Sequence, residues 1–146
     1  MADADPFRLA RFLDAQDGGV HDRALAELRR GRKTGHWMWF VFPQVAGLGM
    51  SATSRHYAVS SLDEARAYLA HPVLGARLRE AAEVVAASSV PSAETLLGGI
   101  DAVKLRSSAT LFLRADPDEP RFAAVLERYF DGRADDATDR LLGAAG

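Results

Sequence analysis

The chain has 146 residues, a net charge of −2 and no cysteine. This length fits a single domain over residues 1–146, and the missing cysteines exclude disulfides, zinc–thiolate sites, iron–sulfur clusters and cysteine nucleophiles. The acidic balance disfavours nucleic acid as a partner. With no apolar leader and no apolar run of membrane-spanning length, we expect a cytoplasmic protein without membrane association.

The N-terminal part predicts two amphipathic helices. Asp5–Pro6 is typical of a helix start and Gly18–Gly19 of a helix end, which predicts a helix over 6–17. Apolar residues at helical spacing from Val20 onward predict a second helix that ends before Gly35. Its last turn is expected to be basic, which suits the negative end of a helix dipole, and contains Arg29, Arg30, Arg32 and Lys33.

The segment from Trp37 to Pro43 has no polar side chain apart from the indole N–H groups. Pattern alone does not separate a buried strand from a short helix here, and the helical surroundings favour a helix. The polar stretch 51–57 is predicted to be rich in turns.

The second half predicts further helices, each opened by a cap or a proline. Ser61 and Glu64 form a capping-box pattern, and Asp101 and Asp136 are predicted N-caps. The expected ranges are 62–70, 72–87, a short helix from Ser92 to Gly98, 102–115, 121–131 and a last one through Leu142. The predicted fold is all-α, a single compact domain of about eight short-to-medium helices, with solenoid-like stacking of helix pairs as one possible arrangement.

The aromatic segment is the first candidate site. The core interpretation is favoured because aromatic runs are usually buried. The functional alternative is a pocket wall in which Trp37 and Trp39 stack a planar ligand, with Lys33, His36 and Gln44 at the rim.

Two other segments have a structural and a functional interpretation. Gly47 and Gly49 are typical of turns, but they would also let the backbone approach a ligand. The stretch from Asp101 to Thr110 is explained by capping, yet its lysine and hydroxyl groups would suit an anionic group. The residues in question are Lys104, Ser107 and Ser108.

The four histidines lack the spacing of metal ligands, and no zinc-protease, Walker or Gly-x-Ser-x-Gly motif is present. We therefore predict no metal and no cofactor.

The string from Lys33 and His36 through Gln44, followed by Gly47, Gly49, Ser51, Ser54 and Tyr57, resembles the signature of the bacterial family of unknown function DUF1810. The resemblance continues through 62–78, 101–112 and 122–138. It implies an all-helical fold of the type seen in a mycobacterial hypothetical protein, and it implies no established activity. Some members are labelled calpastatin-like, which has no physical basis in these residues. Arg106 and Ala109 depart from the pattern, where a smaller polar residue and a methionine are expected.

The chain is also similar to domains proposed to process ADP-ribose and related nucleotides, in a tyrosine-bearing helix, a Leu-Gly-Arg-like step and the helix at 105–112.

These features leave three hypotheses. The first is a small nucleotide- or sugar-phosphate-like ligand in a Trp/His/Lys-lined cleft, with His36 or Asp101 as an acid–base group of a hydrolase. The second is a protein-interaction module without catalytic activity, in which the basic stretch 29–33 meets an acidic partner. The third is nucleic-acid binding, which the net charge disfavours. The sequence does not decide whether the protein is an enzyme.

Overall fold

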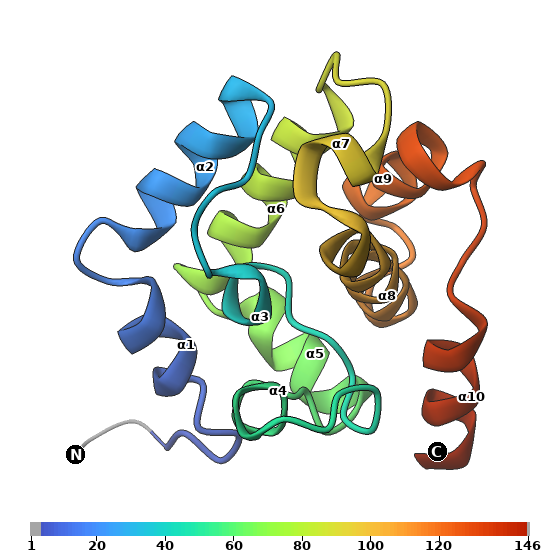
Figure 1. Ribbon diagram of the computed structural model, residues 1–146. Coiled ribbons are helices and arrows are strands. Elements are labelled where there is room, and N and C mark those ends of the chain that lie inside the picture. The colour runs from blue at the N-terminus through green and yellow to red at the C-terminus, as the bar shows by residue number, and fades with distance from the viewer. Residues whose placement is uncertain (1–3, 146) are drawn as a thin grey trace.

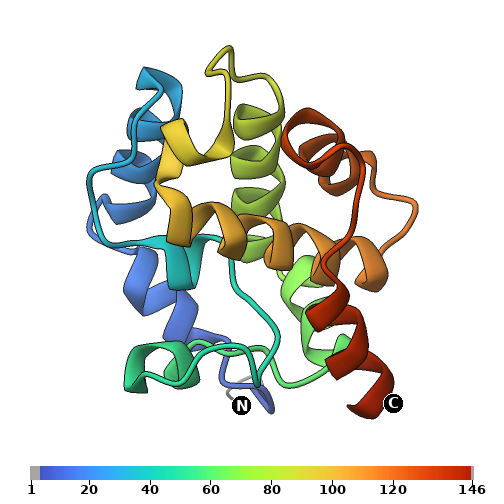
Figure 2. The same ribbon diagram turned by 45° about the vertical axis from the view of Figure 1, so that its right-hand side comes forward.

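Helix α8, Gly99–Ala115, is the longest of the described helices and packs against four others (Figure 1). It contacts α5, α7, α9 and α10, and Figure 2 shows it running crosswise in front of the more upright α6. Its buried residues lie on more than one side, since Leu105, Leu111 and Phe112 are each at most 1% exposed. A helix that is apolar on several sides belongs in the interior, and α8 therefore carries much of the core.

The structure is a computed structural model that describes residues 4–145, and in this range it contains ten helices and no strand. Besides α8 they are α1 (Ala10–Gln16), α2 (Val20–Arg30), α3 (Met38–Val41), α4 (Ala52–His56), α5 (Leu62–Ala70), α6 (Leu74–Ala86), α7 (Ala93–Leu97), α9 (Pro120–Phe130) and α10 (Asp136–Ala145). The all-α prediction is confirmed. None of the described helices has both the length and the apolar surface to cross a lipid bilayer.

The packing differs from a row of stacked helix pairs. Helix α6 contacts α2, α5 and α9, and α8 contacts elements from both halves of the chain. In a solenoid each repeat contacts only its neighbours. Here one core is shared by segments far apart in sequence, and its aromatic centre includes the edge-to-face pair of Phe12 and Tyr68, with ring centroids 5.1 Å apart.

Several helix starts differ from the predicted positions. Helix α1 begins at Ala10, not residue 6, because the Asp5 carboxylate accepts from the backbone N–H groups of Leu9 and Ala10 across a turn. Helix α6 begins at Leu74, not at Pro72, because the His71 Nδ1 accepts from the N–H groups of Val73 and Leu74. In both places a side chain accepts hydrogen bonds from backbone N–H groups at the observed helix start. The helix therefore begins later in the chain than the sequence pattern predicted.

Helices α8 and α10 show a similar shift in their caps. Helix α8 begins at Gly99 with Gly98 before it, so Asp101 lies in the first turn and is not the cap. Helix α10 is capped by Asp135, whose Oδ2 accepts from the Thr138 N–H at 3.0 Å, and not by Asp136. In each case the predicted aspartate is displaced from the cap by one to three positions.

Two segments have a different structure from the one predicted. The stretch 51–57 contains the short helix α4, because the Ser51 hydroxyl accepts from the Ser54 N–H and caps it. Helix α2 ends at Arg30, where Gly31 adopts a left-handed φ of +87°. Arg32 and Lys33 therefore lie beyond the helix and do not face its dipole.

The segment after α2 is held by the Glu27 carboxylate. Its Oε1 accepts from the N–H groups of Thr34 and Gly35 at 2.6 and 2.8 Å, and from the Trp37 indole N–H at 3.0 Å. Burial opposes ionisation of this carboxyl, but the three donors outweigh it and lower the pKa of Glu27 to about 2. This cluster sets the path of the chain from Lys33 into α3.

We predict that acid weakens the fold through Glu27. Because its folded pKa lies below the ordinary value of 4.5, its contribution is complete above pH 4.5 and is lost as pH falls toward 2. The contribution is on the order of 3 kcal/mol. Chemical denaturation at pH 7 should show Glu27→Gln to be less stable by a comparable amount, and the difference should shrink at pH 3. A pH-independent difference would contradict this assignment.

A second pH effect is expected from His21, which is 5% exposed and has no hydrogen-bond partner within the described residues. Burial and the nearby Arg77 lower its pKa, while Glu80 and Asp22 act in the opposite direction. A lowered histidine pKa means that the unfolded chain binds the proton more tightly, so stability is lost as pH falls below 6.5. The unfolding free energy should decrease between pH 7 and 5 by up to about 1.4 kcal/mol per pH unit. His21→Gln should have a smaller slope in this window, and an equal slope would show that His21 is not responsible.

Candidate functional site

The two stretches singled out in the sequence meet through Asp101. Its carboxylate pairs with Lys33 Nζ at 2.8 Å and with Lys104 Nζ at 3.4 Å. Lys104 Nζ also lies 4.5 Å from the centre of the Trp39 ring. Residues some sixty positions apart are thus in direct contact, and both lysines are mostly buried, with side-chain exposures of 10% and 19%.

The two tryptophans have different environments. Trp37 is 3% exposed and donates its indole N–H to Glu27, so it is part of the core. Trp39 is partly exposed, yet its Nε1 atom is buried and has no hydrogen-bond partner among the described residues. A buried N–H without a partner is costly, which marks the edge of Trp39 as a place where a bound acceptor would be stabilising.

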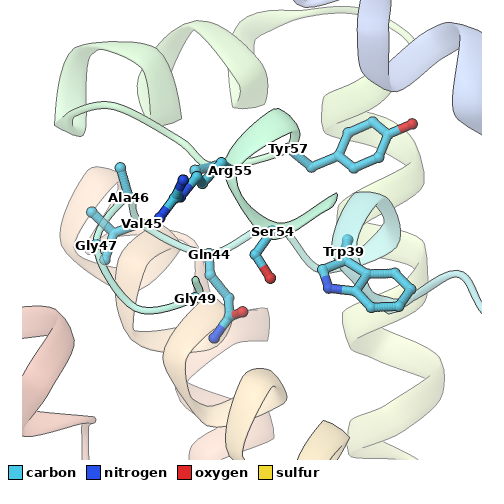
Figure 3. Close-up of a pocket in the computed structure, with 10 residues that line it drawn as sticks. Trp39, Gln44, Val45, Ala46, Gly47, Gly49, Ser54, Arg55 and Tyr57 are labelled. Carbon is cyan, nitrogen blue, oxygen red and sulfur yellow. The ribbon is translucent and has the colours of Figure 1, made fainter. Parts of the chain in front are cut away.

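Trp39 lines a hollow of about 150 Å³ between α3, α4 and the loop that joins them (Figure 3). Figure 3 shows its indole nitrogen facing Ser54 and Gln44, whereas the Tyr57 hydroxyl points away. The lining residues are Trp39, Gln44, Val45, Ala46, Gly47, Gly49, Ser54, Arg55, Tyr57 and Ala58. We call this space the inner hollow.

The hydroxyl of Ser54 lines the inner hollow and has an unused hydrogen-bond donor. The Ser51 hydroxyl donates to Ser54 Oγ at 2.9 Å, so the Ser54 O–H is left to donate elsewhere. The Gln44 amide makes no hydrogen bond within residues 4–145, and its backbone carbonyl accepts from the Val59 N–H. The inner hollow therefore offers several neutral donors.

A second space of about 370 Å³, the outer hollow, lies between the same loop, α8 and α10. It shares Gln44, Gly49 and Ser54 with the inner hollow, so the two are adjacent. The rest of its lining is Leu48, Ile100, Val103, Lys104, Ser107, Asp135 and Ala137.

The structure brings some of the predicted site residues together and separates others. Trp39, Gln44, Lys104 and Ser107 line one or both hollows. Asp101 and Lys33 form the ion pair beside them. By contrast, His36 is exposed and Trp37 belongs to the core, and neither lines the inner or the outer hollow. Ser108 is 1% exposed, and its Oγ has no partner among the described atoms.

The lining residues that were not predicted as site residues include the polar side chains of Ser54, Arg55 and Asp135. Both Ser54 and Arg55 lie in a stretch that was predicted as turns, and Ser54 was noted only as part of the family signature. Asp135 accepts from the Ser107 and Thr138 hydroxyls. The Ser51–Ser54 spacing, which fits a helix cap, was the available signal for the first two.

The described residues hold no group of three or more His, Asp or Glu side chains placed to bind a metal ion. The lining residues that can donate hydrogen bonds or contribute positive charge include Trp39, Ser54, Gln44, Arg55 and Lys104.

The fold and the paired hollows define a helical domain with a cleft of small-molecule size. The family described as "Protein of unknown function (DUF1810)" matches residues 6–142, so the chain belongs to this family. Its structure is similar to that of the conserved hypothetical protein Rv1873 from Mycobacterium tuberculosis, with a TM-score of 0.92 and 48% sequence identity. The match covers 95% of this chain and 99% of the other. Among curated proteins, none matches this chain.

We predict that Gly49→Ala distorts the loop that forms the shared wall of the two hollows. A Cβ at Gly49 would overlap the Ser54 side chain, and the loop would have to move to relieve the overlap. We expect a loss of stability of roughly 1–3 kcal/mol and a changed environment of Trp39. Thermal unfolding and tryptophan emission measure the two effects. Gly99→Ala is a control, because a Cβ there meets no atom within 4 Å, and an equal effect of both substitutions would contradict the prediction.

Proposed function

We propose that the protein binds a small phosphate-bearing molecule, such as a nucleotide or a sugar phosphate, in the cleft formed by the two hollows. The observation that supports this most strongly is the buried, unpartnered indole N–H of Trp39, which faces the inner hollow. An acceptor oxygen placed there would supply the missing hydrogen bond.

The surrounding groups fit an oxygen-rich ligand. Ser54 and Gln44 contribute neutral donors, and Arg55 and Lys104 contribute positive charge. Arginine matches phosphate oxygens with paired N–H groups, and lysine acts as a point charge. The two volumes, about 150 and 370 Å³, are together within the usual range of small-molecule sites.

The contact with Trp39 differs from the stacking that the sequence suggested. Lys104 Nζ covers one face of the ring at 4.5 Å, so a flat ligand does not have that face available. Trp39 would instead act through its N–H edge. Lys104 would be less free to bind an anion than an unpaired lysine, because Asp101 already neutralises part of its charge.

The hydrolase interpretation depends on His36 or Asp101 as the acid–base group. Asp101 is held between two lysines, and His36 is exposed and lines neither hollow. Binding therefore has more support in the geometry than catalysis. Turnover of a phosphate ester that is lost in both His36→Ala and Asp101→Asn would support a hydrolase, and turnover unchanged by them would remove these residues from the reaction.

Proton–nitrogen NMR tests the binding proposal directly, because the chain has two tryptophans and hence two indole cross-peaks. The variants Trp37→Phe and Trp39→Phe each remove one cross-peak and so assign the two peaks. Both variants make the same chemical change. On titration with AMP, ADP-ribose and ribose 5-phosphate, we expect the Trp39 peak to move and the Trp37 peak to stay, because Trp37 is bonded to Glu27.

The two variants also provide matched controls in stability and affinity. Trp37→Phe should lose roughly 1.5–3 kcal/mol, since it removes a hydrogen bond to a carboxylate. Its affinity should change little, because the bonds from Thr34 and Gly35 to Glu27 still anchor this segment. Trp39→Phe should lose less stability and bind at least about tenfold more weakly. If no phosphate compound moves the Trp39 peak, the binding proposal is wrong.

A further inference from the structure

The two hollows differ in chemistry. The residues that line the inner hollow include one cation, Arg55, and no carboxylate. Arg55 is exposed, and its guanidinium makes no ion pair within residues 4–145. An anion placed in the inner hollow would thus meet a free positive charge and the donors of Trp39 and Ser54, with no negative side chain in the wall.

The outer hollow has a largely apolar wall formed by Leu48, Ile100, Val103 and Ala137. Ile100 and Val103 are 78% and 62% exposed, and they are two of the four large apolar side chains that the described surface exposes. Single exposed apolar residues are ordinary, but two side by side on one hollow indicate a surface that an apolar group covers.

Apart from Gln44 and Ser54, which it shares with the inner hollow, the polar groups of the outer hollow are already engaged. Asp135 Oδ2 accepts from the Ser107 hydroxyl and from both the hydroxyl and the N–H of Thr138. Lys104 is paired with Asp101. A phosphate in the outer hollow would lie beside one carboxylate and compete with another for its cation, so the inner hollow is the more favourable place for it.

These contrasts determine an orientation. We propose, resting on the proposed function, that the ligand is a phosphomonoester of an apolar group, with the phosphate in the inner hollow and the apolar group in the outer one. Gln44, Gly49 and Ser54 lie at the junction, where the ester linkage passes. A nucleoside monophosphate with its base outermost and an aryl phosphate both belong to this class, whereas a plain sugar phosphate lacks the apolar part.

The test compares three probes, namely inorganic phosphate, phenyl phosphate and phenol, with the Trp39 indole peak as the readout. We expect phenyl phosphate to bind at least about tenfold more tightly than either of the others, because it fills both hollows. Arg55→Gln should weaken phosphate and phenyl phosphate by the same factor, about tenfold. Both Arg55 and Val103 are exposed, so neither substitution should impair folding.

Val103→Asn should weaken phenyl phosphate several-fold and leave inorganic phosphate unchanged. The control is Val73→Asn, the same change at another exposed valine, which lines neither hollow and should alter nothing. Equal affinities for phosphate and phenyl phosphate, or an Arg55→Gln variant with undiminished affinity, overturn the proposed orientation. In that case movement of the Trp39 peak by AMP or ribose 5-phosphate still supports the proposed function. If no probe and no nucleotide moves the peak, both proposals fail.

Discussion

The arrangement of the cleft depends on one carboxylate, that of Glu27, which lines neither hollow. Glu27 accepts three hydrogen bonds from residues 34–37. These bonds orient the Trp37 side chain toward the core and fix the path of the chain between α2 and α3. That path brings Lys33 against Asp101 on α8, and it starts α3, which carries Trp39. Because the acceptor is charged and mostly buried, each of these bonds is stronger than a bond between neutral groups. The position of Trp39 is thus a consequence of how its neighbour is anchored.

Two tryptophans in one aromatic string have opposite roles in the structure. The indole of Trp37 is buried and donates a hydrogen bond to Glu27. The indole of Trp39 has a buried N–H for which no described residue is an acceptor. Folded proteins satisfy most buried donors, so an exception indicates strain or a missing partner. Trp39 adjoins a hollow with further free donors, which favours a missing partner. The core interpretation of the string therefore applies to Trp37, and the functional interpretation is proposed for Trp39 alone.

The loop between α9 and α10 is linked to the cleft through α8. Arg106 donates to the backbone carbonyls of Arg133 and Ala134, and the Thr110 hydroxyl accepts from the Asp135 N–H. These bonds place Asp135 at the outer hollow and begin α10 beside it. Arg106 departs from the pattern that the family resemblance suggested, and the structure gives it this positioning contact. The outer wall of the cleft is therefore built from one helix and the segment that this helix holds.

The sequence alone determined the all-α class and most helix ranges, since periodicity, prolines, glycines and the Ser61 cap are local signals that the fold retained. It also indicated that the aromatic string and the stretch from Asp101 to Thr110 were unusual. Only the tertiary structure decided which indole is sealed, that Asp101 pairs with two lysines instead of capping α8, and that Ser54 and Arg55 line the inner hollow. The reason is physical: a hydrogen-bond partner or a cavity wall arises from segments distant in sequence, and local spacing carries no information about which of them meet.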